Sequence, residues 1–196
     1  MFITPDNCLE GLRYKALCDG KTVLTTTYGI RRGFWILDPN KIPQTRYEYA
    51  CCLDGLERVG QAVSMSNLLQ LKTGLKIDLM VTGASAVNTK GVRYGKGHGF
   101  FDLEWGMLFT LGLVSSSTPT AAIVHDCQLL EEELQTTDLD TGCDVIAAPS
   151  QLIEVKEARK PRCGIVWDKL EANMLDEMRP LQELRHLIKS GVVLQP

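Results

Sequence analysis

The sequence predicts an α/β domain built around a mostly parallel sheet. Short apolar segments typical of buried strands alternate along the chain with segments whose apolar residues recur at helical spacing. Polar residues follow several of the apolar segments, at the strand ends where such sheets bind ligands. A length of 196 residues suits one compact domain, which we assign to residues 1–196.

The first third of the chain predicts a helix followed by two strands. Residues 4–7 offer N-cap side chains for a helix whose apolar residues keep helical spacing as far as Gly20, a C-terminal cap. The β-branched run at 21–28 and the apolar segment at 33–37 then predict two strands, with Arg31 in the turn between them.

The middle of the chain predicts two helices, a strand and a further helix. Residues 45–58 keep an i, i+3, i+4 apolar rhythm, which predicts one continuous helix, and Ser66 can cap a short helical turn after it. The apolar run at 77–82 predicts a buried strand, and residues 103–113 predict the helix that follows the intervening glycines.

The last third of the chain predicts three more strands and a C-terminal helical region. The strands are expected at 120–124, 144–149 and 164–167, and helix is expected over 171–189, interrupted by Pro180, which suits the first turn of a new helix. The acidic stretch at 131–140 is interpreted as a solvated loop.

The glycine-rich segment at 91–102 is the strongest candidate for a binding site. It holds four glycines together with Arg93, Lys96 and Asp102, between the strand at 77–82 and a helix. Glycines let backbone N–H groups crowd around an anion, and the start of a helix carries partial positive charge. Arg93 and Lys96 can neutralise phosphate oxygens, and Asp102 can hold the magnesium ion that accompanies a nucleotide. A flexible turn without a ligand is the alternative.

The spacing of this segment fits neither of two common phosphate-binding motifs. Gly97 rather than Ser or Thr follows Lys96, which excludes a Walker A motif, and Phe101 and Asp102 stand where a dinucleotide fingerprint needs its third glycine. The pattern instead resembles the signature of the 5-formyltetrahydrofolate cyclo-ligase family, the methenyltetrahydrofolate synthetases. The residues that match this signature in order are Gly91, Arg93, Gly95, Gly97, Gly99, Phe100, Phe101 and Asp102.

The resemblance is greatest to the cyclo-ligase-like branch, which includes the methenyltetrahydrofolate synthetase domain-containing proteins. It implies a Rossmann-like three-layer α/β/α sandwich and an enzyme that uses ATP and Mg²⁺ on a reduced folate. In that reaction ATP phosphorylates the formyl oxygen of 5-formyltetrahydrofolate, N10 attacks, and phosphate leaves as 5,10-methenyltetrahydrofolate forms. Two phenylalanines, Phe100 and Phe101, replace the usual tyrosines, which removes the hydrogen bonds of their hydroxyl groups.

Residue roles follow from the same resemblance. It implies phosphate contacts for Arg93 and Lys96, and a magnesium contact for Asp102. It also implies that Glu104 is a weaker candidate for binding a metal-bound water. The amides of three residues would form the phosphate cradle: Gly95, Gly97 and Gly99.

Further candidates rest on the residue types alone. His98 lies inside the glycine-rich segment and can donate to a phosphate. His125 and Asp126 at a strand end can form an acid/base or substrate-orienting pair, or a structural hydrogen bond that closes the strand. Arg31 can supply charge that the family enzymes take from a basic N-terminal helix, a helix that we expect this domain to lack.

That expected absence leaves two interpretations of function open. One is a cyclo-ligase with a small-molecule substrate in folate metabolism. The other is a catalytically weakened or inactive nucleotide- or anion-binding module that works through a protein partner, or a protein that acts on another heterocycle such as a thiamine-related compound.

The composition limits the remaining classes. Lysines and arginines are mostly dispersed and the formal net charge is -3, so nucleic acid is an unlikely partner. The apolar runs are too short to span a bilayer, which excludes a membrane-spanning role. The 7 cysteines include no C-x-x-C pair, so zinc and redox motifs are unsupported, and we expect a cytoplasmic protein with reduced thiols.

Overall fold

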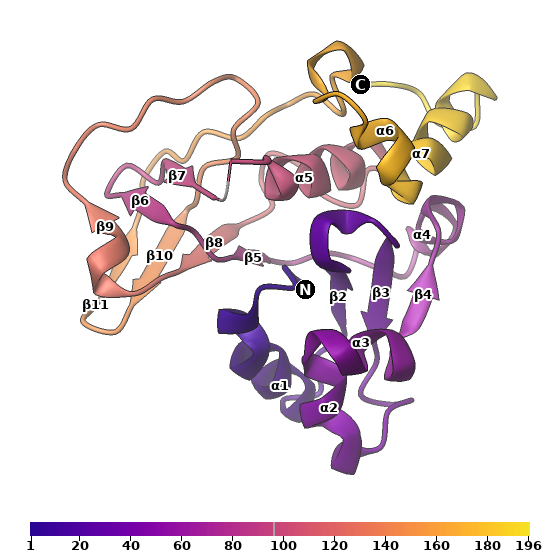
Figure 1. The fold of residues 1–196 in the computed structure, drawn as a ribbon, viewed down its shortest axis with the longest axis horizontal. Helices are drawn as coiled ribbons and strands as arrows, with labels where there is room; N and C mark the ends of the chain where they lie inside the picture. The colour runs from indigo at the N-terminus through magenta and orange to yellow at the C-terminus, as the bar shows by residue number, and fades with distance from the viewer. Residues whose placement is uncertain (96) are drawn as a thin grey trace.

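The computed structural model describes residues 1–95 and 97–196, which form a central eight-stranded sheet covered by helices on both faces (Figure 1). Neighbouring strands follow the order β11-β10-β8-β5-β1-β2-β3-β4. The strands are β1 (Phe2–Ile3), β2 (Val23–Thr26), β3 (Phe34–Leu37), β4 (Gln61–Val63), β5 (Met80–Thr82), β8 (Thr120–Ile123), β10 (Val145–Ala148) and β11 (Gln151–Glu154).

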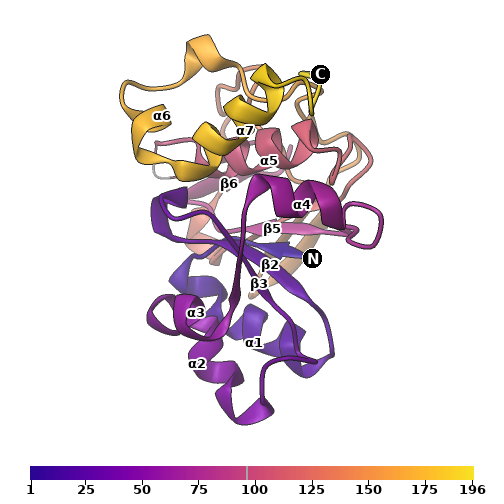
Figure 2. The ribbon, with the colours of Figure 1, turned by 90° about the vertical axis from the view of Figure 1, so that its right-hand side faces the viewer.

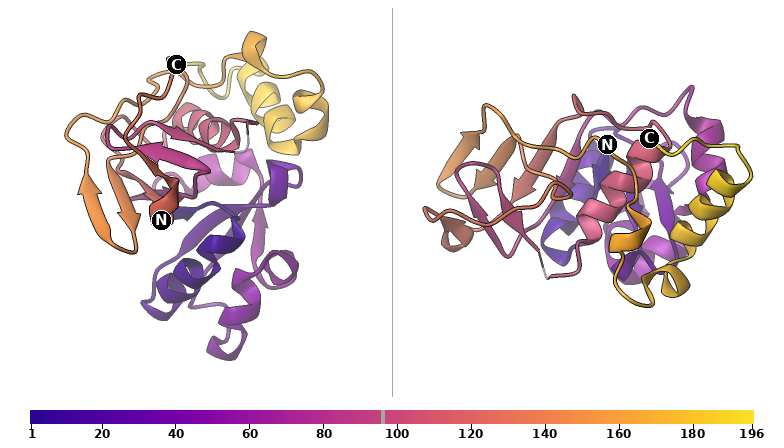
Figure 3. Two further views of the ribbon diagram at one scale, coloured as in Figure 1. Left: turned by 60° about the vertical axis from the view of Figure 1, so that its left-hand side comes forward. Right: turned by 90° about the horizontal axis from the view of Figure 1, so that it is seen from above.

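Parallel pairing dominates the centre of this sheet. Strands β10, β8, β5, β1 and β2 are parallel to one another, whereas β3, β4 and β11 pair antiparallel at the two edges. The predicted mostly parallel sheet is therefore confirmed. Figure 3 shows the orange strands β10 and β11 at one end of the molecule and the yellow C-terminal helix at the other.

Helices form the two outer layers, as Figures 1 and 2 show. Helices α1, α2 and α3 cover one face of the sheet, and α4, α5, α6 and α7 cover the other. The three-layer α/β/α arrangement is thus confirmed. The helices are α1 (Glu10–Cys18), α2 (Tyr47–Cys51), α3 (Leu53–Val59), α4 (Met65–Leu71), α5 (Phe100–Thr110), α6 (Met174–Glu177) and α7 (Arg179–Lys189).

Alternation along the short strands builds one hydrophobic core on each face of the sheet. Phe2 and Leu24 are buried against the helices of the α5 face, whereas Ile3 and Val23 are buried against α1 and its neighbours. Full burial of each such side chain contributes about 1.5–3 kcal/mol to the stability of the fold. The parallel strands are therefore apolar on both faces, as covered sheets require.

A small second sheet lies beside the main one and carries part of the glycine-rich segment. It consists of β6 (Ala86–Asn88), β7 (Arg93–Tyr94) and β9 (Leu129–Leu130), in the order β7-β6-β9. Strand β7 pairs antiparallel with β6. Neither this sheet nor β1, β4 and β11 was predicted.

The helix expected over 45–58 is wrong as a single element. It is broken at Cys52, whose backbone is extended (φ -86°, ψ 158°), into α2 and α3. Gly55 makes the return of the chain possible, because a Cβ there would lie 1.7 Å from the carbonyl oxygen of Tyr49. Only glycine allows α3 to pack this closely against the end of α2.

Two other predictions need correction. Ser64, not Ser66, is the N-cap of α4, and its side chain shares a capping box with Asn67. The segment 164–167 is not a strand: its apolar residues pack on α5, and η5 (Trp167–Lys169) is a 3-10 helix. In the described residues, no helix is long and apolar enough to cross a membrane.

Candidate functional site

A cavity of about 970 Å³ opens at the carboxyl ends of the parallel strands β1, β2 and β5. Thr4, Thr27 and Gly83, which directly follow these three strands, line its wall, and the first turn of α5 lines the opposite side. Ligands bind at this edge in open α/β sheets. A volume of this size accommodates a small organic molecule together with a phosphate group.

Three of the predicted cradle glycines line this cavity. They are Gly95, Gly97 and Gly99. Gly97 (φ 90°) and Gly99 (φ 62°) adopt left-handed backbone conformations that other residues rarely take, and Gly99 is the N-cap of α5. The first turn of the 11-residue α5, whose backbone N–H groups have no partner within the helix, therefore lies at the cavity wall. Lys96, predicted to contact phosphate, lies outside the described residues.

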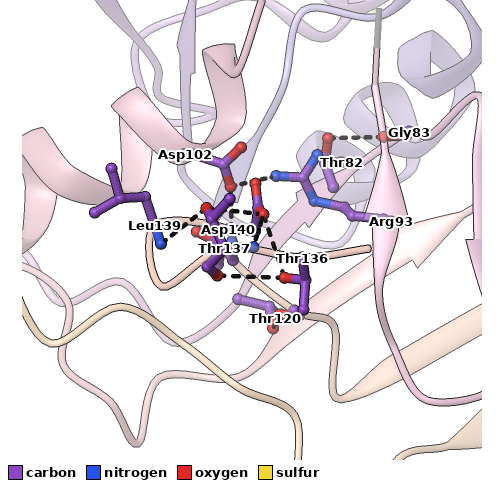
Figure 4. Close-up of polar contacts among 11 residues, drawn as sticks. Thr82, Gly83, Arg93, Asp102, Thr120, Thr136, Thr137, Leu139 and Asp140 are labelled. Atoms are coloured by element: carbon purple, nitrogen blue, oxygen red, sulfur yellow. Dashed lines mark hydrogen bonds and ion pairs between the residues drawn. The ribbon is translucent and has the colours of Figure 1, made fainter. Parts of the chain in front are cut away.

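Arg93 and Asp102 form an ion pair (Figure 4), and both residues line the cavity. The Arg93 Nη2 atom donates to Asp102 Oδ1 at 2.7 Å, and the Arg93 guanidinium carbon lies 4.4 Å from the centroid of the Phe101 ring. Arg93 Nε is buried and makes no hydrogen bond with the described residues. One guanidinium donor is thus left without a partner among the described residues.

Asp102 joins α5 to the loop that precedes β10. Its Oδ1 atom also accepts the backbone N–H of Thr141 at 2.8 Å. Burial raises the pKa of Asp102 above its ordinary value, whereas Arg93 and the Thr141 amide act in the opposite direction. The carboxylate is therefore held by two fixed donors beside the start of α5.

Glu104 is the most deeply buried acidic side chain of the cavity wall, at 1% exposure. Thr26, at the end of β2, donates its hydroxyl to Glu104 Oε1 at 2.5 Å. Glu104 Oε2 has no hydrogen-bond partner among the described residues. Burial raises the pKa of Glu104 to about 8, while the hydrogen bond from Thr26 lowers it. The metal-bound water suggested for Glu104 stays a prediction.

His98 lies at the mouth of the cavity. Its ring stacks on Phe100, with centroids 5.2 Å apart, and its Nδ1 atom is 3.9 Å from Glu171 Oε2. Both His98 and Glu171 line the cavity and are largely exposed. The position is open to a ligand, and a phosphate contact for His98 stays a prediction.

Four other candidates lie outside the cavity lining. Arg31 forms a 3.1 Å ion pair with Glu177 on the surface. Asp126 accepts the amide and hydroxyl of Ser150, which lowers the pKa of Asp126. His125 caps the short helix η4 (Asp126–Gln128). These hydrogen bonds of His125 and Asp126 are the kind expected if the two residues close the end of the strand rather than act as an acid/base pair.

Gly91 is the fourth of these candidates. It turns the chain between β6 and β7 in a left-handed conformation (φ 79°). A Cβ at Gly91 would lie 2.4 Å from the carbonyl oxygen of Cys143. This glycine therefore packs the turn against the chain before β10, rather than lining the cavity.

Sequence reasoning missed several polar residues that line the cavity. Asp6, Thr26 and Thr82 follow or end three parallel strands, and Asp140 belongs to the acidic stretch expected to be a solvated loop. Asp140 accepts from Thr136 and Thr137 beside Asp102 (Figure 4). The sequence signal that could have found Thr26 and Thr82 is their position as polar residues at the ends of apolar segments.

The described residues contain no group of three or more His, Cys, Asp or Glu side chains that could hold a metal ion by themselves. Magnesium usually uses only one or two carboxylates together with substrate phosphates. Asp102, in the first turn of α5, brings a carboxylate to the cavity wall and is compatible with a magnesium ion of that kind. The residues thus fit a metal that arrives with a nucleotide.

Comparisons with known proteins find curated relatives of similar sequence. The methenyltetrahydrofolate synthase domain-containing protein of Homo sapiens is 35% identical over 188 residues, which cover 93% of this chain and 47% of that protein. The Bos taurus protein of the same name is 34% identical over 188 residues, which cover 94% of this chain and 48% of that protein. The chain spans about half the length of these curated relatives.

A solved structure is also similar. The NMR structure of Aquifex aeolicus 5,10-methenyltetrahydrofolate synthetase aligns with 81% of this chain and 73% of that chain, at 13% identity and a TM-score of 0.47. The sequence model of the 5-formyltetrahydrofolate cyclo-ligase family matches residues 3–149, which is most of the chain and includes the cavity glycines, Arg93 and Asp102. The chain therefore belongs to the 5-formyltetrahydrofolate cyclo-ligase family.

Proposed function

We propose that this protein is a cyclo-ligase that uses ATP and Mg²⁺ to convert 5-formyltetrahydrofolate into 5,10-methenyltetrahydrofolate, with ADP and phosphate as the other products. The observation that carries the proposal is the junction of Arg93, Asp102 and the N-terminus of α5 at one wall of the cavity. The buried cysteines Cys51 and Cys143 form no disulfide, which fits a reducing cytoplasm, where we place the reaction.

Each part of this junction has a task in the proposed reaction. Phosphoryl transfer depends mainly on positioning and on neutralising charge around the transferred group. The Arg93 guanidinium, aligned by Phe101 and Asp102, would neutralise phosphate oxygens from its place in the cavity wall. The amides at the start of α5 and the preceding glycines add further donors. Asp102 would hold Mg²⁺, which would neutralise phosphate charge when bound.

The remainder of the cavity suits the heterocycle. Apolar side chains line the side formed by α5 and the residues before α6, including Phe100, Trp105 and Ile165. Polar side chains line the strand ends, including Asp6 and Thr26. A flat molecule with polar edges and apolar faces, such as the ring system of a reduced folate, matches this division.

A second function is favoured by the small number of cations. In the parts of the chain that the structure describes, the lysine and arginine side chains that line the cavity are Lys169 and Arg93. Of these two described cations, Arg93 is already paired with Asp102, so its charge is partly compensated before a triphosphate binds. A nucleotide- or anion-binding module without cyclo-ligase turnover, or activity on another heterocycle such as a thiamine-related compound, is therefore the alternative.

An absorbance assay for methenyltetrahydrofolate tests the proposal. Purified protein with 5-formyltetrahydrofolate, ATP and Mg²⁺ should produce methenyltetrahydrofolate, and removal of Mg²⁺ with a chelator should stop the reaction. Asp102→Ala should lower the rate at least about a hundredfold, because removal of a charged group that stabilises the transition state costs about 3 kcal/mol. Glu154→Gln, on the exposed edge strand β11, is the matched control and should keep the wild-type rate.

The binding-module alternative makes the opposite prediction for turnover. Protein that is folded and stabilised by Mg²⁺ and ATP, yet forms no methenyltetrahydrofolate, would contradict the cyclo-ligase proposal and favour the module. Activity that survives unchanged in Asp102→Ala would show that the reaction does not use the junction described above.

A further inference from the structure

Glu104 and Thr26 form a buried polar pair in the wall of the cavity. Both side chains are at most 1% exposed. Thr26 supplies one hydrogen bond to Oε1, and the second carboxyl oxygen, Oε2, receives none from the described residues. A buried polar atom without a partner lowers the stability of a fold, so its presence in a native structure calls for a reason.

The position of the pair supplies that reason. Glu104 and Thr26 line the same cavity as Arg93 and Asp102, from α5 on one side and the end of β2 on the other. Thr26 fixes the carboxyl group in one orientation through Oε1. In the described residues, Glu104 takes part in no ion pair within 4.0 Å. The carboxyl group is thus oriented and desolvated, with Oε2 left for a group that the protein itself does not provide.

We infer that Glu104 is a specificity-determining residue that binds the heterocyclic ligand through a hydrogen bond at Oε2, with Thr26 as its positioning residue. The ligand class is a nitrogen heterocycle that carries a hydrogen-bonding N–H, ring nitrogen or carbonyl group at its buried edge. This role rests on the proposed function, and it differs from the role in binding a metal-bound water because it does not need the negative charge of the carboxylate.

A double variant separates this role from a structural one. Thr26→Val with Glu104→Met replaces both partners by apolar side chains of similar size, so that no polar group is left alone in the core. Such replacements are neutral or stabilising when the polar pair serves no other purpose. We expect the double variant to unfold at a temperature equal to or above that of the wild type, and to bind 5-formyltetrahydrofolate at least about tenfold more weakly.

Glu104→Gln tests whether ligand binding depends on a hydrogen bond to the side chain at position 104 or on its negative charge. The amide keeps two polar atoms in the same place and can still pair with Thr26, so the affinity for 5-formyltetrahydrofolate should fall less than in the double variant. Glu154→Met on the exposed edge of β11 is the control and should bind as the wild type does. Calorimetric titration gives the affinities, and thermal denaturation without ligand gives the stabilities.

The outcomes are distinct. A stable double variant with wild-type affinity overturns the inference, as does a double variant that is destabilised while its affinity is unchanged. Equal losses in Glu104→Gln and the double variant also overturn it, because the ligand would then depend on charge. If the wild type itself binds no 5-formyltetrahydrofolate, the proposed function fails and the inference fails with it, a result unlike the others because no variant is involved.

Discussion

Gly91 and Gly99 belong to the same glycine-rich segment but serve different purposes. Gly99 begins α5 at the cavity wall, whereas Gly91 packs a turn against the carbonyl of Cys143 and lies away from the cavity. The family signature therefore combines residues of the binding site with residues that shape the strand leading to it. A motif read from sequence does not separate the two.

Gly91→Ala should lower the free energy of unfolding by more than about 2 kcal/mol, because a left-handed backbone and a backbone clash both oppose a Cβ there. Gly11→Ala, in α1 where nothing lies within 4 Å of the added Cβ, is the control and should be neutral or stabilising. Urea denaturation measures both. Equal stability of the two variants would show that the turn at Gly91 is not tightly packed.

Glu104 predicts a pH dependence of stability with a definite sign. Burial raises its pKa from 4.5 to about 8 in the folded protein. Between these values the unfolded chain loses the proton while the folded protein keeps it, so the free energy of unfolding falls as pH rises, by at most about 1.4 kcal/mol per pH unit. Below pH 4.5 and above pH 8 this contribution is constant.

The comparison of wild type with Glu104→Gln isolates this contribution, since other titrating groups are shared. Chemical denaturation at several pH values between 5 and 8 should show the wild type losing stability relative to Glu104→Gln as pH rises. Parallel curves for the two proteins would mean that Glu104 does not titrate in this range.

At the scale of elements, Arg13 of α1 ties together segments that the sequence keeps apart. Its guanidinium donates to the carbonyl oxygens of Thr4 at 2.6 Å, Asp6 at 3.0 Å and Cys51 at 2.9 Å. Arg13 is 1% exposed, and burial lowers its pKa. It thereby holds the end of α2 against the loop that carries Thr4 and Asp6 into the cavity wall.

Arg13→Lys should therefore be strongly destabilising, although it keeps the charge. An ammonium group cannot reproduce the planar fork of donors, and carbonyl oxygens would lose their partners, so we expect a loss of about 2–3 kcal/mol in urea denaturation. Arg179→Lys, an exposed residue paired with Glu183 on α7, should change stability by less than about 0.5 kcal/mol. Similar effects of the two substitutions would contradict the role given to Arg13.

The elements that the sequence predicts correctly are those with local signals. Strand β5 and helix α5 follow from hydrophobic periodicity, although β6 and β7, which come between β5 and the cavity glycines, do not. Strand β1 spans only Phe2–Ile3, too short for any periodicity. The break at Cys52 depends on the contact of Gly55 with Tyr49, which no propensity reports.

The site was predictable only where its residues are close in sequence. Thr26 meets Glu104 from the end of β2, and Thr141 reaches Asp102 from the loop before β10. These partners are brought together by the order of strands in the sheet, which crosses over between distant segments. Spacing along the chain carries no signal for such contacts.

At the scale of the whole molecule, three separate parts of the fold line the cavity. The parallel strand ends supply threonines and Asp6, the small second sheet supplies Arg93, and α5 supplies Asp102 and Glu104. The central claim is that the junction of Arg93 with the start of α5 is a phosphate site.

Calorimetric titration of ATP with Mg²⁺ into the wild type and Arg93→Met tests this claim most directly. Loss of a charge-assisted donor should weaken binding about tenfold to a hundredfold. Arg159→Met, which removes an exposed arginine paired with Asp138, should bind ATP as the wild type does. Unchanged ATP affinity in folded Arg93→Met protein would contradict the claim that phosphate binds at this junction.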